Sequence, residues 1–252
     1  MRLSKIIGFF SFIASFLMPL ALSAAQATPS LNLNLGGTGP KEISTTVQIL
    51  MMLTVLSLAP AIVVTMTSFT RFVIVFSLLK QAMGTQQIPP NQVLIGLCLF
   101  MSLVVMGPVI KKINDQALQP YINNELSQTE ALAAASKPLR EFMLQHTREK
   151  DMALFVGLSE KEKPKTLEDV SMAAIIPGFI ISELKTSFQI GFMIYIPFIV
   201  IDIVVASVLL AMGMMVLPPV IISMPFKLMM FVLVDGWNLI VGSLVRSFGV
   251  GV

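Results

Sequence analysis

Four long apolar stretches dominate the pattern of hydrophobic and polar positions in this chain. They run roughly over residues 43–66, 92–110, 188–212 and 226–245. Each is close to the ~20 apolar residues that a helix needs to cross a bilayer. The pattern therefore predicts an all-α protein of the integral-membrane type, with two apolar helical hairpin regions at residues 43–110 and 188–252.

A polar insert, residues 111–187, separates the two apolar regions. Residues 111–185 hold ten Lys or Arg and eleven Asp or Glu, and a segment of this length crosses a membrane largely regardless of its charge. Apolar residues recur at near-helical spacing over residues 139–156. This recurrence predicts an amphipathic helix with Pro138 in its first turn. Residues 159–165, rich in Glu and Lys, are expected to be a solvated connector.

The N-terminus has the pattern of a secretory signal peptide. Two basic residues precede the apolar run 6–22, and Ala25-Gln26-Ala27 follows as a small-x-small cleavage site. We expect residues 1–27 to be a signal peptide, with a non-cleaved anchor helix as the alternative, and residues 28–42 to be a flexible lead-in. Export by this signal predicts that the polar insert lies on the periplasmic side.

Composition narrows the possible functions. Hydrophobic residues make up 55% and charged residues 12%, against about 25% charged in soluble domains. The net charge of +3 comes from scattered basic residues that are mostly matched by acidic ones. We therefore expect no nucleic acid among the binding partners of this chain. The single cysteine, Cys98, and single histidine, His146, cannot form a metal cluster or an intrachain disulfide. No catalytic residue pair occurs at workable spacing, and we expect neither an enzyme nor a cofactor.

Two turns share one sequence pattern. Met83-Gly84 precedes Pro89-Pro90 by the same interval at which Met212-Gly213 precedes Pro218-Pro219. Because Gly ends a helix and Pro-Pro cannot continue one, the pattern predicts two equivalent turns between apolar helices. Common hairpin design and chance both remain open as its origin.

Ionisable residues inside the apolar stretches need partners or water, because lipid solvates charge poorly. The buried charges expected on this ground are Arg71, Asp202 and Asp235, with Glu183, Lys185 and Lys227 at the stretch edges. They either line a pathway or form ion pairs between helices or subunits, and we favour the ion pairs. The segment 68–79, which holds Arg71, is expected to be a helix buried among partners.

The second turn is rich in methionine and free of charge. Met212, Met214 and Met215 lie within it, and thioether side chains are flexible and fill irregular gaps. In an ordinary protein such residues are core. In an oligomeric membrane complex the same softness suits a ring that closes a pore and yields to a passing polypeptide.

Several literal runs resemble the FliP/SctR family of type III secretion export-gate proteins, most closely its flagellar members. They include Met66-Thr-Ser-Phe-Thr-Arg-Phe-Val-Ile-Val-Phe-Ser-Leu-Leu79, Gly84-Thr-Gln-Gln-Ile-Pro-Pro-Asn-Gln-Val-Leu94, Leu139-Arg-Glu-Phe-Met143, Thr147-Arg-Glu-Lys-Asp151, Ile181-Ser-Glu-Leu-Lys-Thr186 and Phe226-Lys-Leu-Met-Met-Phe-Val-Leu-Val-Asp-Gly-Trp-Asn238. The resemblance covers nearly all of the expected mature chain, but no family motif is found in residues 28–41.

The resemblance implies a core subunit of the flagellar type III protein export gate, forming the entrance channel for secreted flagellar proteins. It implies several copies, with five expected, joined to FliQ-like and FliR-like subunits in a helical cone. Further expected partners are other export-apparatus membrane proteins, unfolded exported polypeptides and membrane lipid. The expected location is the bacterial inner membrane at the flagellar basal body.

The resemblance also implies roles for particular residues. The turn methionines Met212, Met214 and Met215 correspond to a channel gasket. Phe142, Phe155 and Glu183 correspond to subunit-interface contacts. The alternative from another class is a subunit of a small-solute transporter or ion channel, although such proteins usually need more spans to enclose a solute site.

Overall fold

The computed structural model describes residues 50, 53–54, 57–58, 60–62, 64–85, 88–159, 166, 169–214 and 216–249. The expected signal peptide, the lead-in, much of the first apolar stretch and most of the connector lie outside the described residues. The chain divides into two units, Met1–Ser57 and Leu58–Val252. Among the described residues of the first unit, the Thr54 hydroxyl donates to the Leu50 carbonyl at 2.8 Å, a bond typical of a helical turn.

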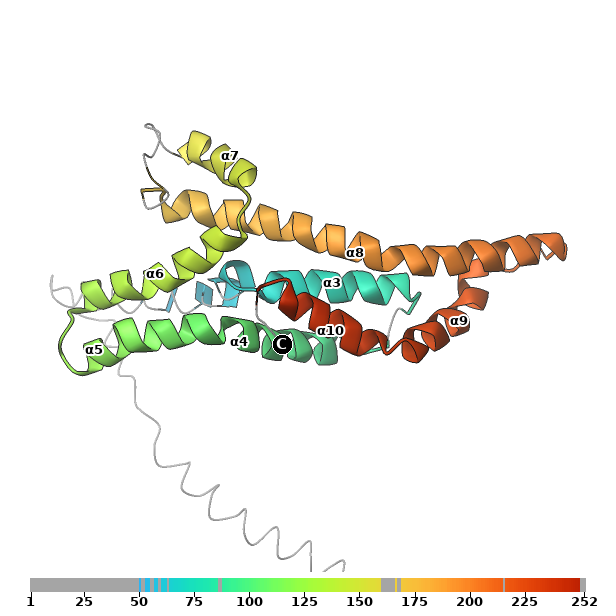
Figure 1. Cartoon of the computed structure of the whole chain (residues 1–252), viewed down its shortest axis with the longest axis horizontal. Helices are drawn as coiled ribbons and strands as arrows, with labels where there is room; N and C mark the ends of the chain where they lie inside the picture. Colours follow the sequence, from blue (N-terminus) through green and yellow to red (C-terminus); the bar gives the residue numbers. More distant parts are fainter. Residues whose placement is uncertain are drawn as a thin grey trace, which may run out of the picture. The chain divides into compact units, whose positions relative to one another are not determined.

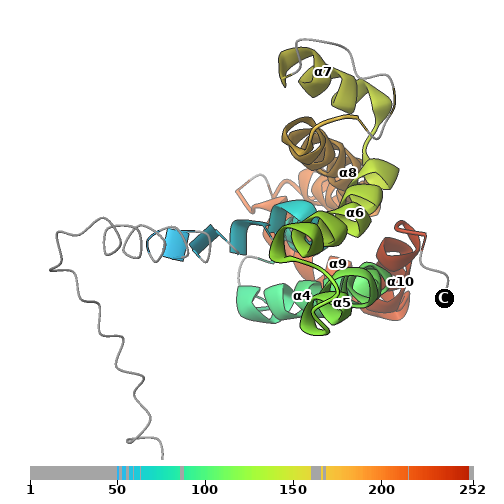
Figure 2. The same ribbon diagram turned by 90° about the vertical axis from the view of Figure 1, so that its left-hand side faces the viewer.

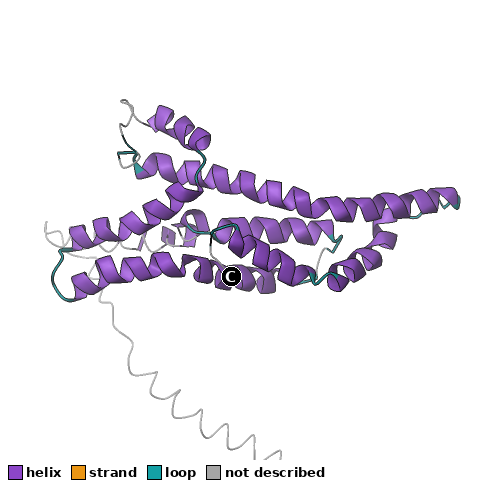
Figure 3. Ribbon diagram, viewed as in Figure 1, coloured by secondary structure: helices purple, strands orange, loops and turns teal. Residues whose placement is uncertain are grey.

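The second unit is helical wherever it forms regular structure in its described part, which confirms the all-α class (Figures 1 and 3). The elements are α3 (Phe69–Ala82), α4 (Asn91–Ile113), the π-helix η2 (Asn114–Leu118), α5 (Gln119–Ile122), α6 (Gln128–His146), α7 (Glu149–Ser159), α8 (Met172–Ala211), α9 (Pro219–Leu233) and α10 (Gly236–Arg246). Helices 91–122 and 172–211 are long and apolar enough to cross a membrane, and two bent helix pairs qualify if each pair counts as one span.

Helix α3 is the centre of the core. Its residues Phe72, Val75, Phe76 and Leu79 are each at most 1% exposed, and α3 packs against both α8 and α4. The spacing of these residues places them on the inward side of one helix. The sequence predicted a helix buried among partners here, but the structure buries it within its own chain.

Two helices cross the expected borders of the polar insert. Helix α4 continues beyond residue 110 and joins α5 through the π-helical turn η2. Helix α8 begins at Met172, well inside the expected insert, and spans 40 residues. Pro177 and Pro197 lie inside α8 without ending it. Each border is a change of polarity along a continuous helix.

The rest of the insert folds as two helices, α6 and α7, and α7 lies on the outer side of α8 (Figure 2). Helix α6 begins at Gln128, where Ser127 and Glu130 form a reciprocal capping box. The predicted start at Pro138 is wrong, because that proline sits inside the helix. The predicted amphipathic helix also breaks after His146, where Thr147 is extended with φ −95° and ψ 131°.

The last apolar stretch bends where a single helix was expected. Helices α9 and α10 meet at an angle of 65°, and Asp235 between them adopts a left-handed conformation with φ 51°. Aspartate tolerates this conformation better than most residues. The bend also packs tightly, because a Cβ on Gly236 would lie 2.3 Å from the Phe231 ring.

Candidate functional site

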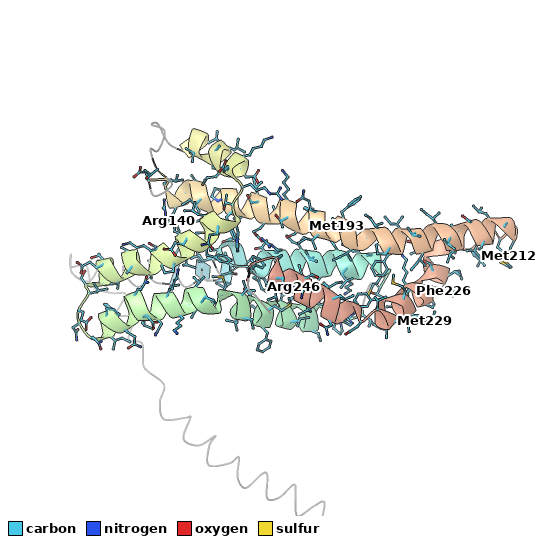
Figure 4. The ribbon with its side chains drawn as sticks, in the orientation of Figure 1. Arg140, Met193, Met212, Phe226, Met229 and Arg246 are labelled. Atoms are coloured by element: carbon cyan, nitrogen blue, oxygen red, sulfur yellow. The ribbon has the colours of Figure 1, made fainter. Side chains whose placement is uncertain are left out.

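The methionine turn closes the end of α8 with a Schellman motif. Gly213 has φ +75°, its amide donates to the Leu210 carbonyl at 3.0 Å, and the Met214 amide donates to the Leu209 carbonyl at 2.9 Å. These two bonds satisfy carbonyls that a helix end leaves free. The turn then leads to Pro219, the first residue of α9. The glycine and proline signals in the sequence thus define a fixed turn at the far end of α8 (Figures 1 and 4).

The side chains of this turn are apolar and exposed. The exposed fractions are 62% for Met212, 43% for Met214, 95% for Val216 and 45% for Leu217. Met215 lies outside the residues whose side chains are described. Burial in the core of its own chain is therefore ruled out for Met212 and Met214. These side chains are free to meet another molecule.

The first turn shares the left-handed glycine of the second turn, but its side chains lie in the opposite environment. Gly84 again has φ +75°, but Met83 is only 2% exposed and Thr85 8% exposed. The Lys80 ammonium donates to the Asn91 side-chain oxygen at 2.8 Å, across the ends of the two helices that the turn joins. One turn is therefore held inside the fold, while its counterpart projects from it.

The helices that carry the projecting turn are also apolar on their surface. An open groove of about 470 Å³ between α8 and α9 is lined by apolar side chains alone, among them Val204, Val208 and Phe226. In the most apolar stretch of α8, only 11% is buried within the chain. Contiguous apolar surface on this scale marks contact with protein or membrane.

A buried ion pair joins α3 to the first half of α8. The Arg71 Nε donates to Glu183 Oε2 at 2.7 Å, and Nη2 pairs with Oε1. The two side chains are 5% and 0% exposed. Bidentate geometry makes this one of the stronger kinds of ion pair. The expected interface residue Glu183 thus has its partner within the chain.

A second ion pair joins α9 to α8 and to the end of α3. The Lys227 ammonium lies 2.6 Å from Asp202 Oδ2 and donates to the Ala82 carbonyl at 3.1 Å. Ser223 donates its hydroxyl to the other Asp202 oxygen. Lys227 is 3% exposed and Asp202 28% exposed at the side chain. The ion pair therefore holds α8 and α9 together at the end of their hairpin that lies next to α3.

The remaining expected residues occupy different environments. Phe142 on α6 is 6% exposed, with its ring 5.9 Å from the ring of Phe179 on α8. Phe155 on α7 is partly buried against the core. Asp235 is exposed in the bend between α9 and α10. Among the described residues that the sequence singled out, two pairs of charges are in direct contact, Arg71 with Glu183 and Lys227 with Asp202.

Sequence reasoning missed Ser247 and Phe248, which follow the last apolar stretch. Ser247 accepts hydrogen bonds from Arg71, and Phe248 is 7% exposed and lies under the Arg71 guanidinium. A terminal Ser-Phe pair carries no local signal of such contacts. Only tertiary structure reveals them.

Comparisons with known proteins agree on one family. The model of the FliP family matches residues 52–244. The chain is 55% identical over 209 residues to the flagellar biosynthetic protein FliP of Bacillus subtilis (strain 168), covering 83% of this chain and 95% of that protein. It is 49% identical over 248 residues to the protein of the same name from Caulobacter vibrioides, covering 98% and 92%. The protein of that name from Pectobacterium carotovorum is 52% identical over 210 residues, covering 83% and 81%.

Proposed function

Because this chain belongs to the FliP family, we propose that it is a core subunit of the flagellar type III protein export gate. In this role it forms the entrance channel for secreted flagellar proteins. Relatives named flagellar biosynthetic protein FliP support the flagellar assignment. The observation that carries the channel role is the projecting, uncharged turn with exposed Met212 and Met214.

Several copies of this turn around one axis would form a closed apolar ring. An ion entering such a ring loses its hydration, so a hydrophobic constriction blocks ions by dewetting. Methionine side chains are flexible enough to move aside for an exported polypeptide and then close again. Met212, Met214 and Met215 are the proposed gasket.

The apolar exterior of the hairpin supports assembly with partners. The gate contains several copies of this subunit, five by expectation, together with FliQ-like and FliR-like subunits in a helical cone. It works with other export-apparatus membrane proteins in the bacterial inner membrane at the flagellar basal body, and its outer surface meets lipid. The insert, residues 111–187, lies on the periplasmic side. Exposed apolar side chains on the second half of α8 and on α9 provide the contact surface.

A small-solute transporter is the alternative from another class, and the groove between α8 and α9 gives it no support. Such a protein encloses its solute between helices with fixed polar groups. The α8–α9 groove is open and lined by apolar side chains such as Val200 and Ile222. No catalytic role is proposed, and the protein is interpreted as a structural subunit of the gate.

The decisive experiment replaces Met212, Met214 and Met215 by alanine in cells whose only copy carries the change. Removing side-chain volume widens the ring, so ion conductance or dye permeability per assembled complex should rise while the amount of complex stays constant. The matched control replaces Met193 and Met229, which are 71% and 56% exposed on α8 and α9 and lie away from the turn (Figure 4).

Met193 and Met229 belong to the proposed contact surface, so the control variant can lower the amount of complex, but its permeability per assembled complex should stay at the wild-type value. Two results count against the gasket. One is permeability per complex equal to wild type in the triple variant. The other is an equal rise in the control, which would show that methionine loss anywhere on the hairpin loosens the complex.

A further inference from the structure

The Ser247–Phe248 pair follows α10 and lies between the core helix α3 and the insert helix α6. Helices α9 and α10 run back from the methionine turn (Figure 1), and α10 passes α3, where the Trp237 ring lies 6.3 Å from the Phe76 ring. The Phe248 ring then lies 5.5 Å from the ring of Phe72 on α3. The Phe248 ring also lies close to two rings on α6. Its centre is 6.1 Å from that of Phe142, with the two ring planes at 19°, and 5.1 Å from that of His146. Phe248 therefore contacts both the core helix α3 and the insert helix α6.

The same two residues complete the surroundings of Arg71. The guanidinium carbon is 3.7 Å from the centre of the Phe248 ring. Its Nη1 donates to the Ser247 hydroxyl at 2.8 Å and to the Ser247 carbonyl at 3.2 Å. The other edge of the guanidinium is bound to Glu183. A buried arginine needs both partners for its N–H groups and shielding of its planar face.

We propose that Ser247–Phe248 is a C-terminal latch that positions Phe142 and Glu183 for assembly of the subunit. This rests on the proposed function, because assembly into the gate is what the latch serves. Phe142 and Glu183 are 6% and 0% exposed in the chain by itself. They therefore act on assembly by fixing α6 and α8 relative to α3, through Arg71 and the Phe248 ring.

The latch is far from the methionine turn. Glu183 and Met212 are separated by 29 residues, nearly all within α8, which corresponds to about 44 Å along an α-helix. A latch defect is thus expected to lower the amount of assembled complex without changing permeability per complex. Failure of the gasket proposal would leave this expectation untouched.

A substitution series at Phe248 tests the role of its ring. Phe248→Tyr keeps the aromatic face over Arg71 and should assemble as wild type. Phe248→Leu keeps apolar bulk without the face, and Phe248→Ala removes both, so assembled complex should fall in that order. For Phe248→Ala we expect a loss of about fivefold or more, since one or two kcal/mol change a folding equilibrium by that factor. Leucine assembling as well as phenylalanine would overturn the role of the ring.

A double-mutant cycle tests whether Phe248 acts through Phe142. Contacting residues give non-additive effects, while distant residues add. The melting temperature of the purified subunit and the yield of complex should therefore fall no further in the Phe142→Ala/Phe248→Ala variant than in the worse single variant. Phe100 on α4, 72% exposed, is the control, and Phe100→Ala should add to Phe248→Ala. Additive losses for Phe142 and Phe248 would overturn the latch.

Discussion

Replacing Glu183 by alanine should destabilise the subunit before it assembles. The change leaves the Arg71 guanidinium buried, with its side chain 5% exposed, and without the carboxylate that neutralises it. Breaking a buried pair by removing one partner costs about 3–5 kcal/mol. Because both hydrogen bonds to Ser247 remain, we expect the lower end, about 3 kcal/mol.

That loss is large for a protein of this size. Total stabilities are about 5–15 kcal/mol, and 3 kcal/mol corresponds to a fall of roughly 6–12 °C in melting temperature for 150–250 residues. The assay is thermal unfolding of the detergent-solubilised, unassembled subunit. The matched control is Glu141→Ala, which breaks the exposed Lys112–Glu141 pair, 54% and 57% exposed, and should cost about 0–1 kcal/mol.

A compensating pair of substitutions sharpens the test. Replacing both members of a buried ion pair by apolar residues of similar volume is often neutral or stabilising. The Arg71→Met/Glu183→Leu variant should therefore melt well above Glu183→Ala. The reasoning fails if Glu183→Ala melts like Glu141→Ala, or if the double variant is worse than the single one. A normal melting temperature combined with failed assembly would instead assign Glu183 to contact between subunits.

Three further predictions concern single positions. Burial lowers the pKa of His146 from 6.5 to about 4. Because the unfolded chain binds this proton more tightly, the stability of the fold should fall as the pH drops from 6.5 towards 4 and then level off. Melting curves of the wild type and of His146→Gln, recorded across this pH range, check this. Gly236→Ala should cost about 1–3 kcal/mol by pushing the Phe231 ring, whereas Gly107→Ala, with open space around it, should not lower the melting temperature. Ser127→Ala should cost about 0.5–2 kcal/mol and speed amide exchange in the first turn of α6.

The two turns were predictable because their signals are local. A glycine that ends a helix and a proline pair that cannot continue one lie within eight residues, and both Gly84 and Gly213 adopt the left-handed conformation. The start of α6 also had a local signal, the capping box of Ser127 and Glu130. Pro138 masked it, because a proline was expected to open the helix that it in fact occupies.

The contacts that join distant parts of the chain were not predictable from one sequence. Arg71 and Glu183 are 112 positions apart, and periodicity says nothing about which buried cation meets which anion. No local signal showed that Met83 is buried and Met212 exposed, because their two turns have the same pattern of glycine and proline residues. Environment is set by tertiary packing, which overrides such local patterns.

The first half of helix α8 packs against other helices of the chain, whereas the second half leaves large apolar side chains exposed. The first half binds α3, α6 and α7. On the second half, large apolar side chains are exposed in the chain by itself: Phe192, Met193, Ile196, Val200, Ile203 and Val204. Burying a side chain of this size contributes about 1.5–3 kcal/mol, so these six alone represent roughly 10 kcal/mol, as much as a typical protein's whole stability. We therefore expect the partner surface that covers this half of α8 to set the position of the methionine turn, and we expect the proposed ring to close in the assembled complex alone.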